Sequence, residues 1–209
     1  MYAESKKIIL VANSDKVKDI NSLIDDGDVI VRFNVPEDDK IKKTGYRTDI
    51  LFLANTVDLM EDRLKSDKFN SFINSLEDTS IVFPFEDELI SKINPKCKVV
   101  YRKFFLKFKE YIKNSDNNKY VSYFEEKNIP VDIIDQSYYW AAKDSINADD
   151  SSILSTGFIA ATYFLNNKKY SDYDLYLCGF TFEGWSGHSW SEEKRHILNL
   201  KNKSSIHLI

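Results

Sequence analysis

Short apolar runs separated by polar turns recur along most of the chain and predict the strands of a buried sheet. Continuous runs of this kind are typical of parallel strands, because helices cover both faces of a parallel sheet. The runs that we interpret as strands lie at 7–12, 29–33, 50–54, 81–85, 97–101, 131–135, 175–180 and 206–209.

Between these runs, apolar residues recur at spacings of three and four, as they do on the buried face of a helix. The predicted helices span 16–24, 57–76, 86–93, 120–127 and 158–165, and another follows His188. Strands that alternate with helices predict an α/β fold with a mostly parallel, right-handed wound sheet and helices on both faces.

Three segments depart from this alternation. The aromatic and lysine-rich segment 104–112 is interpreted as a packed helix with solvated lysines, and a surface for an acceptor or a lipid is the alternative. We expect 36–43 to be a charged loop. Segment 136–150 is the least regular part of the chain and could form a lid over a site; its aromatic residues 138–140 would either stack on a sugar or pack at the base of that lid.

Composition limits the class of protein. The 209 residues fit a single domain, 1–209, and their 43% apolar content is too high for a disordered chain. The net charge is −4 with acidic and basic residues interspersed, so no basic stripe favours nucleic-acid binding.

No segment indicates export or membrane insertion. The first apolar run is too short for a signal sequence, and no run of about 18 apolar residues occurs. The two cysteines, Cys97 and Cys178, are interpreted as buried thiols of a reducing compartment. They form no CxxC or mixed His/Cys group that would indicate a metal site.

Polar side chains follow the first two predicted strands. Asn13 and Ser14 come directly after the first strand, and Asn34 follows the second. Such strand ends meet at one edge of a parallel sheet, where nucleotides commonly bind. The glycine-rich dinucleotide fingerprint is absent from this turn, so the sequence does not indicate binding of NAD or FAD. The alternative is that Asn13 and Ser14 only cap the next helix.

Candidate functional residues are most concentrated between residues 154 and 196. Ser155, Thr156 and Gly157 form a small-residue turn at the start of a predicted helix, where free N–H groups and the helix dipole attract an anion. The strand 175–180 then runs into a loop that carries His188. An anion cradle and a histidine base would thus lie together, although a lone histidine in such a loop can also be merely exposed or capping.

Three patches of the chain, in order, resemble the eukaryotic-type sialyltransferases, glycosyltransferase family 29. Val11–Asn55 is similar to the long sialyl motif of that family, Leu154–Phe180 to its short motif, and the HSWSEE segment at 188–193 to its very short motif. The resemblance implies a Rossmann-like fold of the variant GT-A type. The family's further His/Tyr motif has no counterpart in 181–187, and its cysteine pair is not reproduced.

The resemblance implies an inverting, metal-independent transfer of sialic acid from CMP-sialic acid to a glycan hydroxyl. It implies that His188 is the general base and that Glu193 steadies its loop or places the acceptor. The residues implied for the CMP-sugar donor are Asn13, Ser14, Asn34, Ser155, Thr156 and Gly157.

No cofactor or metal is expected, because Asp25-Asp26-Gly27-Asp28 lies between a helix and a strand and is interpreted as a turn rather than a metal motif. The partners would be a nucleotide-sugar donor and a glycan acceptor, in a bacterial, cytoplasmic enzyme that is at most peripheral to the inner face of the membrane. The alternatives are a CMP-Kdo-dependent transferase, a non-catalytic module that binds a nucleotide or sugar, and a hydrolase or transferase of another class.

Overall fold

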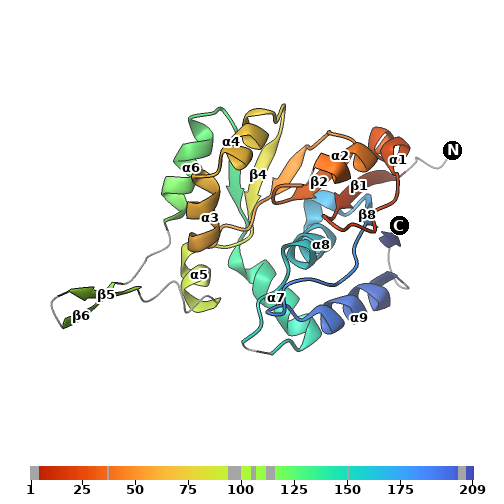
Figure 1. Ribbon diagram of the computed structural model, residues 1–209. Helices are drawn as coiled ribbons and strands as arrows, with labels where there is room; N and C mark the ends of the chain where they lie inside the picture. Colours follow the sequence, from red (N-terminus) through yellow and green to blue (C-terminus); the bar gives the residue numbers. More distant parts are fainter. Residues whose placement is uncertain are drawn as a thin grey trace.

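Seven parallel strands form one sheet in the computed structural model, which describes residues 5–36, 38–93, 100–104, 107–111, 116–149, 151–201 and 206–209 (Figure 1). Their order across the sheet is β7-β4-β3-β2-β1-β8-β9. The strands are β1 (Lys6–Val11), β2 (Val29–Phe33), β3 (Ile50–Phe52), β4 (Ser80–Phe83), β7 (Val131–Ile133), β8 (Tyr173–Cys178) and β9 (Ile206–Leu208). The sheet confirms the predicted parallel α/β architecture.

The strand order reverses beside β1. From β1 the chain proceeds outward to β7 at one edge, and then returns to place β8 on the free side of β1. At the end of β1, Val11 pairs with Arg32 of β2 and with Cys178 of β8. The carboxyl ends of β1, β2 and β8 therefore lie side by side at the point where an open α/β sheet usually binds its ligand.

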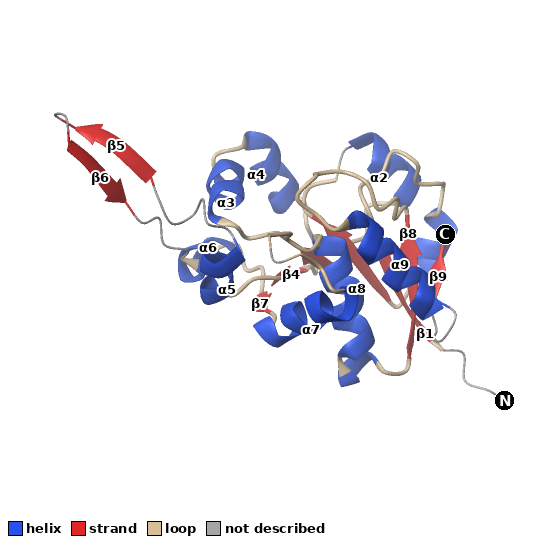
Figure 2. Cartoon of the chain, turned by 90° about the horizontal axis from the view of Figure 1, so that it is seen from below, coloured by secondary structure: helices blue, strands red, loops and turns tan. Residues whose placement is uncertain are grey.

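Helices cover both faces of the sheet, as Figure 2 shows. Alternate strand residues divide between the faces: Ile8 and Leu10 pack with one group of helices, and Ile9 and Val11 face the other way. One face is packed by α5 (Asp87–Ile93), α7 (Gln136–Ile146), α8 (Thr156–Asn166) and α9 (Trp190–Lys201). The opposite face is packed by α1 (Asn21–Asp26), α3 (Val57–Leu64), α4 (Asp67–Asn74) and α6 (Asn117–Glu125).

Three helices begin at other places than the sequence pattern predicted. The single helix expected over 57–76 is divided into α3 and α4, because Ser66 caps α4 by accepting a hydrogen bond from the Phe69 N–H. The expected loop 36–43 is wrong: α2 (Asp38–Thr44) occupies it and buries Ile41. The helix expected from residue 16 starts only at Asn21.

The predicted helix 104–112 is wrong. Strand β5 (Val100–Phe104) pairs antiparallel with β6 (Lys107–Tyr111), and neither joins the main sheet. Phe108 stands between Lys107 and Lys109, but Glu110 and Tyr111 break this alternation, so the sequence pattern of 107–111 did not identify the strand. Cys97, in the run predicted as strand 97–101, lies outside the described residues, whereas Cys178 is a free, buried thiol as expected.

The segment predicted to be irregular, 136–150, is largely the regular helix α7. Asp135 caps its start by accepting a hydrogen bond from the Ser137 N–H, and Asn147 ends it in a left-handed conformation. Tyr139 is fully buried against Phe85, so it belongs to the core and is not available to stack on a sugar. The proposal of a lid over a site stays a prediction.

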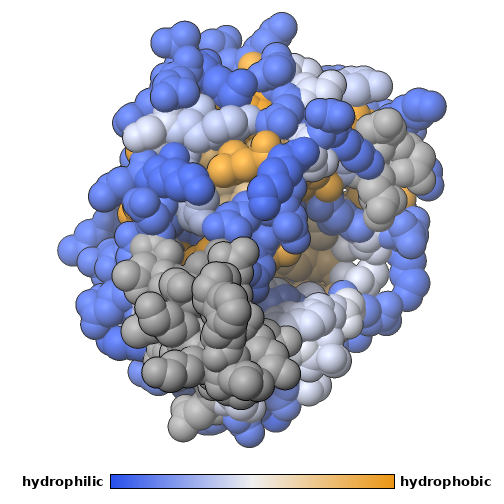
Figure 3. Space-filling view, turned by 60° about the vertical axis from the view of Figure 1, so that its left-hand side comes forward, coloured by the Kyte–Doolittle hydropathy of each residue, from blue (hydrophilic) through white to orange (hydrophobic). Residues whose placement is uncertain are grey.

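One face of the molecule is mainly polar where its residues are described. Hydrophilic residues cover most of the face shown in Figure 3, and hydrophobic residues appear mainly in recesses between them. Among the described residues, the helices are all too short or too polar to cross a lipid bilayer.

Candidate functional site

A hollow of about 250 Å³ opens at the carboxyl ends of β1, β2 and β8. It brings together seven of the eight site residues predicted from the sequence, although they are spread along the chain from residue 13 to residue 188. These seven are Asn13, Ser14, Asn34, Ser155, Thr156, Gly157 and His188. The predicted meeting of distant strand ends in a common cleft therefore occurs, and what each residue does there stays a prediction.

Asn13 and Asn34 line the hollow at the ends of adjacent strands. The Asn13 side-chain amide donates to the Phe33 carbonyl at 2.7 Å, which ties the end of β1 to the end of β2. Asn34 has a left-handed backbone (φ 53°), a conformation that asparagine tolerates better than most residues. Its Oδ1 accepts from the Ala54 N–H at 3.1 Å and from Arg63 at 2.7 Å. With the oxygen held by two donors, the amide plane is fixed.

Arg63 does not line the hollow, but it bonds to Asn34, which does, and sequence reasoning missed it. It belongs to α3 and donates to the Ala54 carbonyl as well as to Asn34. Burial lowers its pKa to about 10, which still leaves the guanidinium charged at neutral pH. A positive charge thus lies directly behind Asn34 and favours a negatively charged ligand in the hollow. Only its position in a helical pattern was visible in the sequence, and this gave no signal for such a contact.

Ser14, which lines the hollow, and Lys16 lie in the loop that follows β1. The Ser14 Oγ accepts a hydrogen bond from the Lys16 N–H at 3.1 Å, which forms a tight turn. The alternative that Asn13 and Ser14 cap the next helix is wrong, because α1 begins at Asn21 and its N-cap is Ile20. The Lys16 ammonium forms an ion pair with Glu183 at 3.2 Å, joining the loop after β1 to the loop after β8. Both side chains are exposed, so this pair contributes little to stability.

Ser155, Thr156 and Gly157 start α8 at the wall of the hollow. Ser155 is the N-cap, and its Oγ accepts from the Phe158 N–H at 3.1 Å. The amino end of the helix carries the positive end of its dipole, so it is suited to an anion. Gly157 is required by packing, since a Cβ at this position would lie 2.9 Å from the Phe180 ring.

Glu193 supports this turn from behind and does not line the hollow. It is 0% exposed, so the alternative of a solvated helix acid is wrong. Its carboxylate accepts from the Ser155 N–H at 2.8 Å and from the Ser155 hydroxyl at 2.6 Å. Burial raises the pKa of Glu193, and the two bonds from Ser155 oppose that shift. The carboxylate therefore positions the start of α8.

His188 is oriented by the backbone of the same segment. Its Nδ1 lies 2.6 Å from the Ile153 carbonyl oxygen. A carbonyl can only accept, so Nδ1 carries the proton and Nε2 of the neutral ring holds a lone pair. Burial lowers the pKa of His188, which keeps the ring neutral at neutral pH. The imidazole can therefore accept a proton, as a general base must.

Two indoles enclose His188, and sequence reasoning did not single them out. The rings of Trp185 and Trp190 meet the imidazole edge to face, at centroid distances of 4.9 and 4.8 Å. The Trp190 indole N–H donates to the Trp185 carbonyl at 2.9 Å, which closes the loop around the histidine. The glycine- and aromatic-rich composition of 182–190 was the available signal.

Metal ligands do not cluster in the part of the chain that the structure describes: no group of three or more His, Cys, Asp or Glu residues there could hold an ion. The segment 25–28 is the end of α1 and a turn, in which Gly27 caps the helix in an extended conformation. Asp28 accepts a hydrogen bond from the Lys7 N–H at 2.7 Å. The interpretation of the whole segment as a turn is therefore only partly right, because Asp25 and Asp26 are the last residues of α1.

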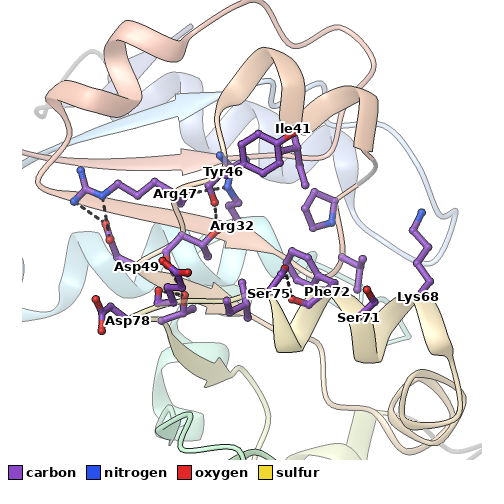
Figure 4. Close-up of a pocket in the computed structure, with 16 residues that line it drawn as sticks. Arg32, Ile41, Tyr46, Arg47, Asp49, Lys68, Ser71, Phe72, Ser75 and Asp78 are labelled. Carbon is purple, nitrogen blue, oxygen red and sulfur yellow. Dashed lines mark hydrogen bonds and ion pairs between the residues drawn. The ribbon is translucent and has the colours of Figure 1, made fainter.

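A larger hollow, of about 930 Å³, lies between α2 and α4 beside the segments that precede β3 and β4 (Figure 4). The two arginines that line it bond to the protein itself. Arg47 pairs with Asp49 at 3.0 Å, and the Arg32 guanidinium donates to the carbonyl oxygens of Thr44 and Gly45. Because these groups are engaged internally, the smaller hollow with its histidine is the better candidate for chemistry.

The fold matches known sialyltransferases. A mammalian sialyltransferase in complex with Gal-β-1-3GalNAc-ortho-nitrophenol aligns over 98% of this chain and 69% of its own, with a TM-score of 0.58 and 15% identity. The sialyltransferase CstII from Campylobacter jejuni, in complex with CMP-3FNeuAc, aligns over 97% and 79%, with a TM-score of 0.51 and 14% identity.

An α-2,3-sialyltransferase from Campylobacter jejuni in its apo form aligns over 100% of this chain and 77% of its own, with a TM-score of 0.50 and 16% identity. No protein-family model matches the sequence, and a search of curated proteins finds no significant match. At these identities the likeness concerns the fold. The chain has the Rossmann-like, GT-A-like α/β fold of the sialyltransferases, with its polar hollow at the switch point of the sheet.

Proposed function

We propose that this protein is an inverting, metal-independent glycosyltransferase that moves sialic acid, or a related CMP-activated sugar, from the CMP-sugar to a glycan hydroxyl. The observation that carries the proposal is a neutral His188 beside the amino end of α8 in one hollow. The fold of the sialyltransferases, two of them from the bacterium Campylobacter jejuni, supports the same class of reaction.

The arrangement suits cleavage of the bond between the anomeric carbon of the sugar and the phosphate of CMP. Departure of CMP leaves a positive, oxocarbenium-like centre on the sugar and an anion on the phosphate. The amino end of α8 and the charge of Arg63 behind Asn34 stabilise that anion without a divalent ion. The His188 Nε2 removes the proton of the attacking hydroxyl as it adds to the anomeric carbon from the opposite side.

The remaining residues have assigned parts in this scheme. Asn13, Ser14 and Asn34 contact the cytidine, the ribose and the phosphate. Ser155, Thr156 and Gly157 meet the phosphate or the carboxylate of the donor, and Glu193 holds Ser155 in place. No metal or other cofactor takes part. The enzyme would act in a bacterial cytoplasm, at most peripheral to the inner face of the membrane, on a glycan of the cell surface.

The test is a screen for release of free nucleotide from CMP-sialic acid, CMP-Kdo and common UDP- and GDP-sugars, each with and without EDTA. We expect release from a CMP-sugar alone, unaffected by EDTA, and the preferred sugar decides between sialic acid and Kdo. CMP should also raise the melting temperature. If CMP neither binds nor is released, the proposal is refuted.

The assignment of the base has its own matched pair of variants. His188→Ala should keep the affinity for CMP and lose transfer, because only the proton acceptor is removed. His207→Ala is the control, since His207 is exposed on β9 and stacks on Tyr176 outside the hollow. Unchanged transfer in His188→Ala would favour a non-catalytic module that binds a nucleotide or sugar.

A further inference from the structure

The indole of Trp185 is held in an exposed position beside the histidine. The side chain is 59% exposed, whereas most large apolar side chains of the described residues are buried. Exposure of an indole gives up the stabilisation that its burial would provide, so a fixed and exposed tryptophan needs an explanation.

Gly187 has no side chain and so leaves room for the indole of Trp185. A Cβ on Gly187 would lie 2.2 Å from the Trp185 ring, so the indole rests directly against the backbone at this position. Its ring also meets the His188 imidazole nearly at a right angle, at a centroid distance of 4.9 Å. The Trp185 carbonyl also accepts the hydrogen bond from Trp190. The indole is therefore fixed in orientation as well as exposed.

We propose that Trp185 is the platform on which the acceptor sugar lies while its hydroxyl is deprotonated. The inference rests on the proposed function and adds to it the residue that binds the acceptor. A hydroxyl in hydrogen-bond contact with the His188 Nε2 brings its sugar ring next to the neighbouring indole. The C–H groups on one face of a pyranose pack well on an aromatic face, and the hydroxyls at its edge stay hydrated.

The aromatic residues that the sequence suggested for stacking do not compete for this role. Tyr139 is fully buried, and Tyr138 and Trp140 pack against the core around α7. Trp190 lines the hollow itself and braces the loop through its N–H, so it belongs to the support of the histidine. Among the three tryptophans of the chain, Trp185 alone combines contact with His188 and a largely exposed ring.

The test compares Trp185→Ala and Trp185→Phe with the wild type in transfer from the preferred CMP-sugar to lactose, cellobiose or maltose. We expect Trp185→Ala to raise the acceptor KM about tenfold or more, the scale on which truncating a central aromatic contact acts. The phenyl ring of Trp185→Phe should recover part of that loss. The affinity for CMP and the slow release of CMP without acceptor should not change in either variant.

Two further variants separate a sugar platform from a general effect on folding. Trp140→Phe removes an indole from α7 and should leave the acceptor KM unchanged. Gly187→Ala keeps the indole but displaces it, so it should raise the acceptor KM while CMP still raises the melting temperature.

An unchanged acceptor KM in Trp185→Ala, or no saturable transfer to any of the three disaccharides while CMP release continues, would overturn the inference. Failure of the wild type to bind CMP would instead overturn the proposed function, and this inference with it.

Discussion

Glu193 provides the sharpest test of how the site is held together. It is fully buried, and its two carboxylate oxygens take the N–H and the hydroxyl of Ser155. In Glu193→Ala both Ser155 donors lose their acceptor and a void replaces the carboxylate. Hydrogen bonds to a charged group contribute about 1.5–3 kcal/mol each, so we expect a loss of roughly 3–5 kcal/mol in the free energy of unfolding. The melting temperature should fall on the order of 10 °C.

Glu193→Gln separates the hydrogen bonds from the charge. Its side-chain oxygen still accepts the Ser155 N–H, but its NH₂ group cannot accept the Ser155 hydroxyl, so about 1–2 kcal/mol should be lost. Burial raises the pKa of Glu193 above its ordinary 4.5. The folded state therefore retains this proton at a pH where the unfolded state has released it. The stability of the wild type relative to Glu193→Gln should be greatest below pH 4.5 and decline as the pH rises to the folded-state pKa.

Urea unfolding at several pH values measures both effects, with tryptophan fluorescence as the signal. The matched control is Glu192→Ala, one residue earlier on α9, whose carboxylate bonds to the neighbouring Ser191 hydroxyl. This variant should unfold at the wild-type midpoint. If Glu193→Ala loses less than about 1 kcal/mol, the carboxylate does not hold Ser155 and the reasoning is refuted. A wild-type stability that rises with pH relative to Glu193→Gln would refute the sign of the pKa shift.

Three other predictions follow from the described contacts. Burial lowers the pKa of His188 below its ordinary 6.5, so kcat/KM for the donor should be constant near neutral pH and fall only on the acid side of 6.5, as a pH–rate profile would show. Gly157→Ala places a methyl group 2.9 Å from the Phe180 ring, and calorimetry should detect weaker binding of CMP. Asn55→Ala removes a fully buried amide that bonds to both the N–H and the carbonyl of Phe85, and it should cost about 2–4 kcal/mol in chemical unfolding.

Local patterns were enough for the central strands but not for every segment between them. The runs at β1, β2 and β8 are mostly apolar because helices cover both faces, so their burial is visible in the sequence itself. Helix α7 was missed because polar residues interrupt its buried positions, and the capping Asp135 was the better signal. In the hairpin β5–β6, lysines between aromatic residues were taken for a helix surface, because their mixed spacings do not show the period of two that is typical of a strand.

The residues of the site also differ in how far the sequence alone could predict them. Asn13, Asn34 and His188 could be predicted because side chains at the carboxyl ends of adjacent parallel strands must meet. The contact of Arg63 with Asn34 could not, since it depends on how α3 is rotated over the sheet. The burial of Glu193 depends on the packing of α9 beside the start of α8, and a first-turn acid at the surface would have the same sequence.

One short backbone segment, 153–155, bonds both to the loop that carries His188 and to Glu193, which supports the start of α8. A variant of this loop can therefore affect both parts of the site. The Ile153 N–H donates to the Gly187 carbonyl at 3.0 Å, and the Ile153 carbonyl accepts from His188. Two residues later, Ser155 bonds to Glu193. Because segment 153–155 bonds to the loop on both sides of the histidine, a displacement of either part moves the other. Removal of the His188 ring leaves the bond from the Ile153 N–H to the Gly187 carbonyl in place, so it should affect mainly proton transfer. Loss of Glu193 should instead weaken donor binding and transfer together.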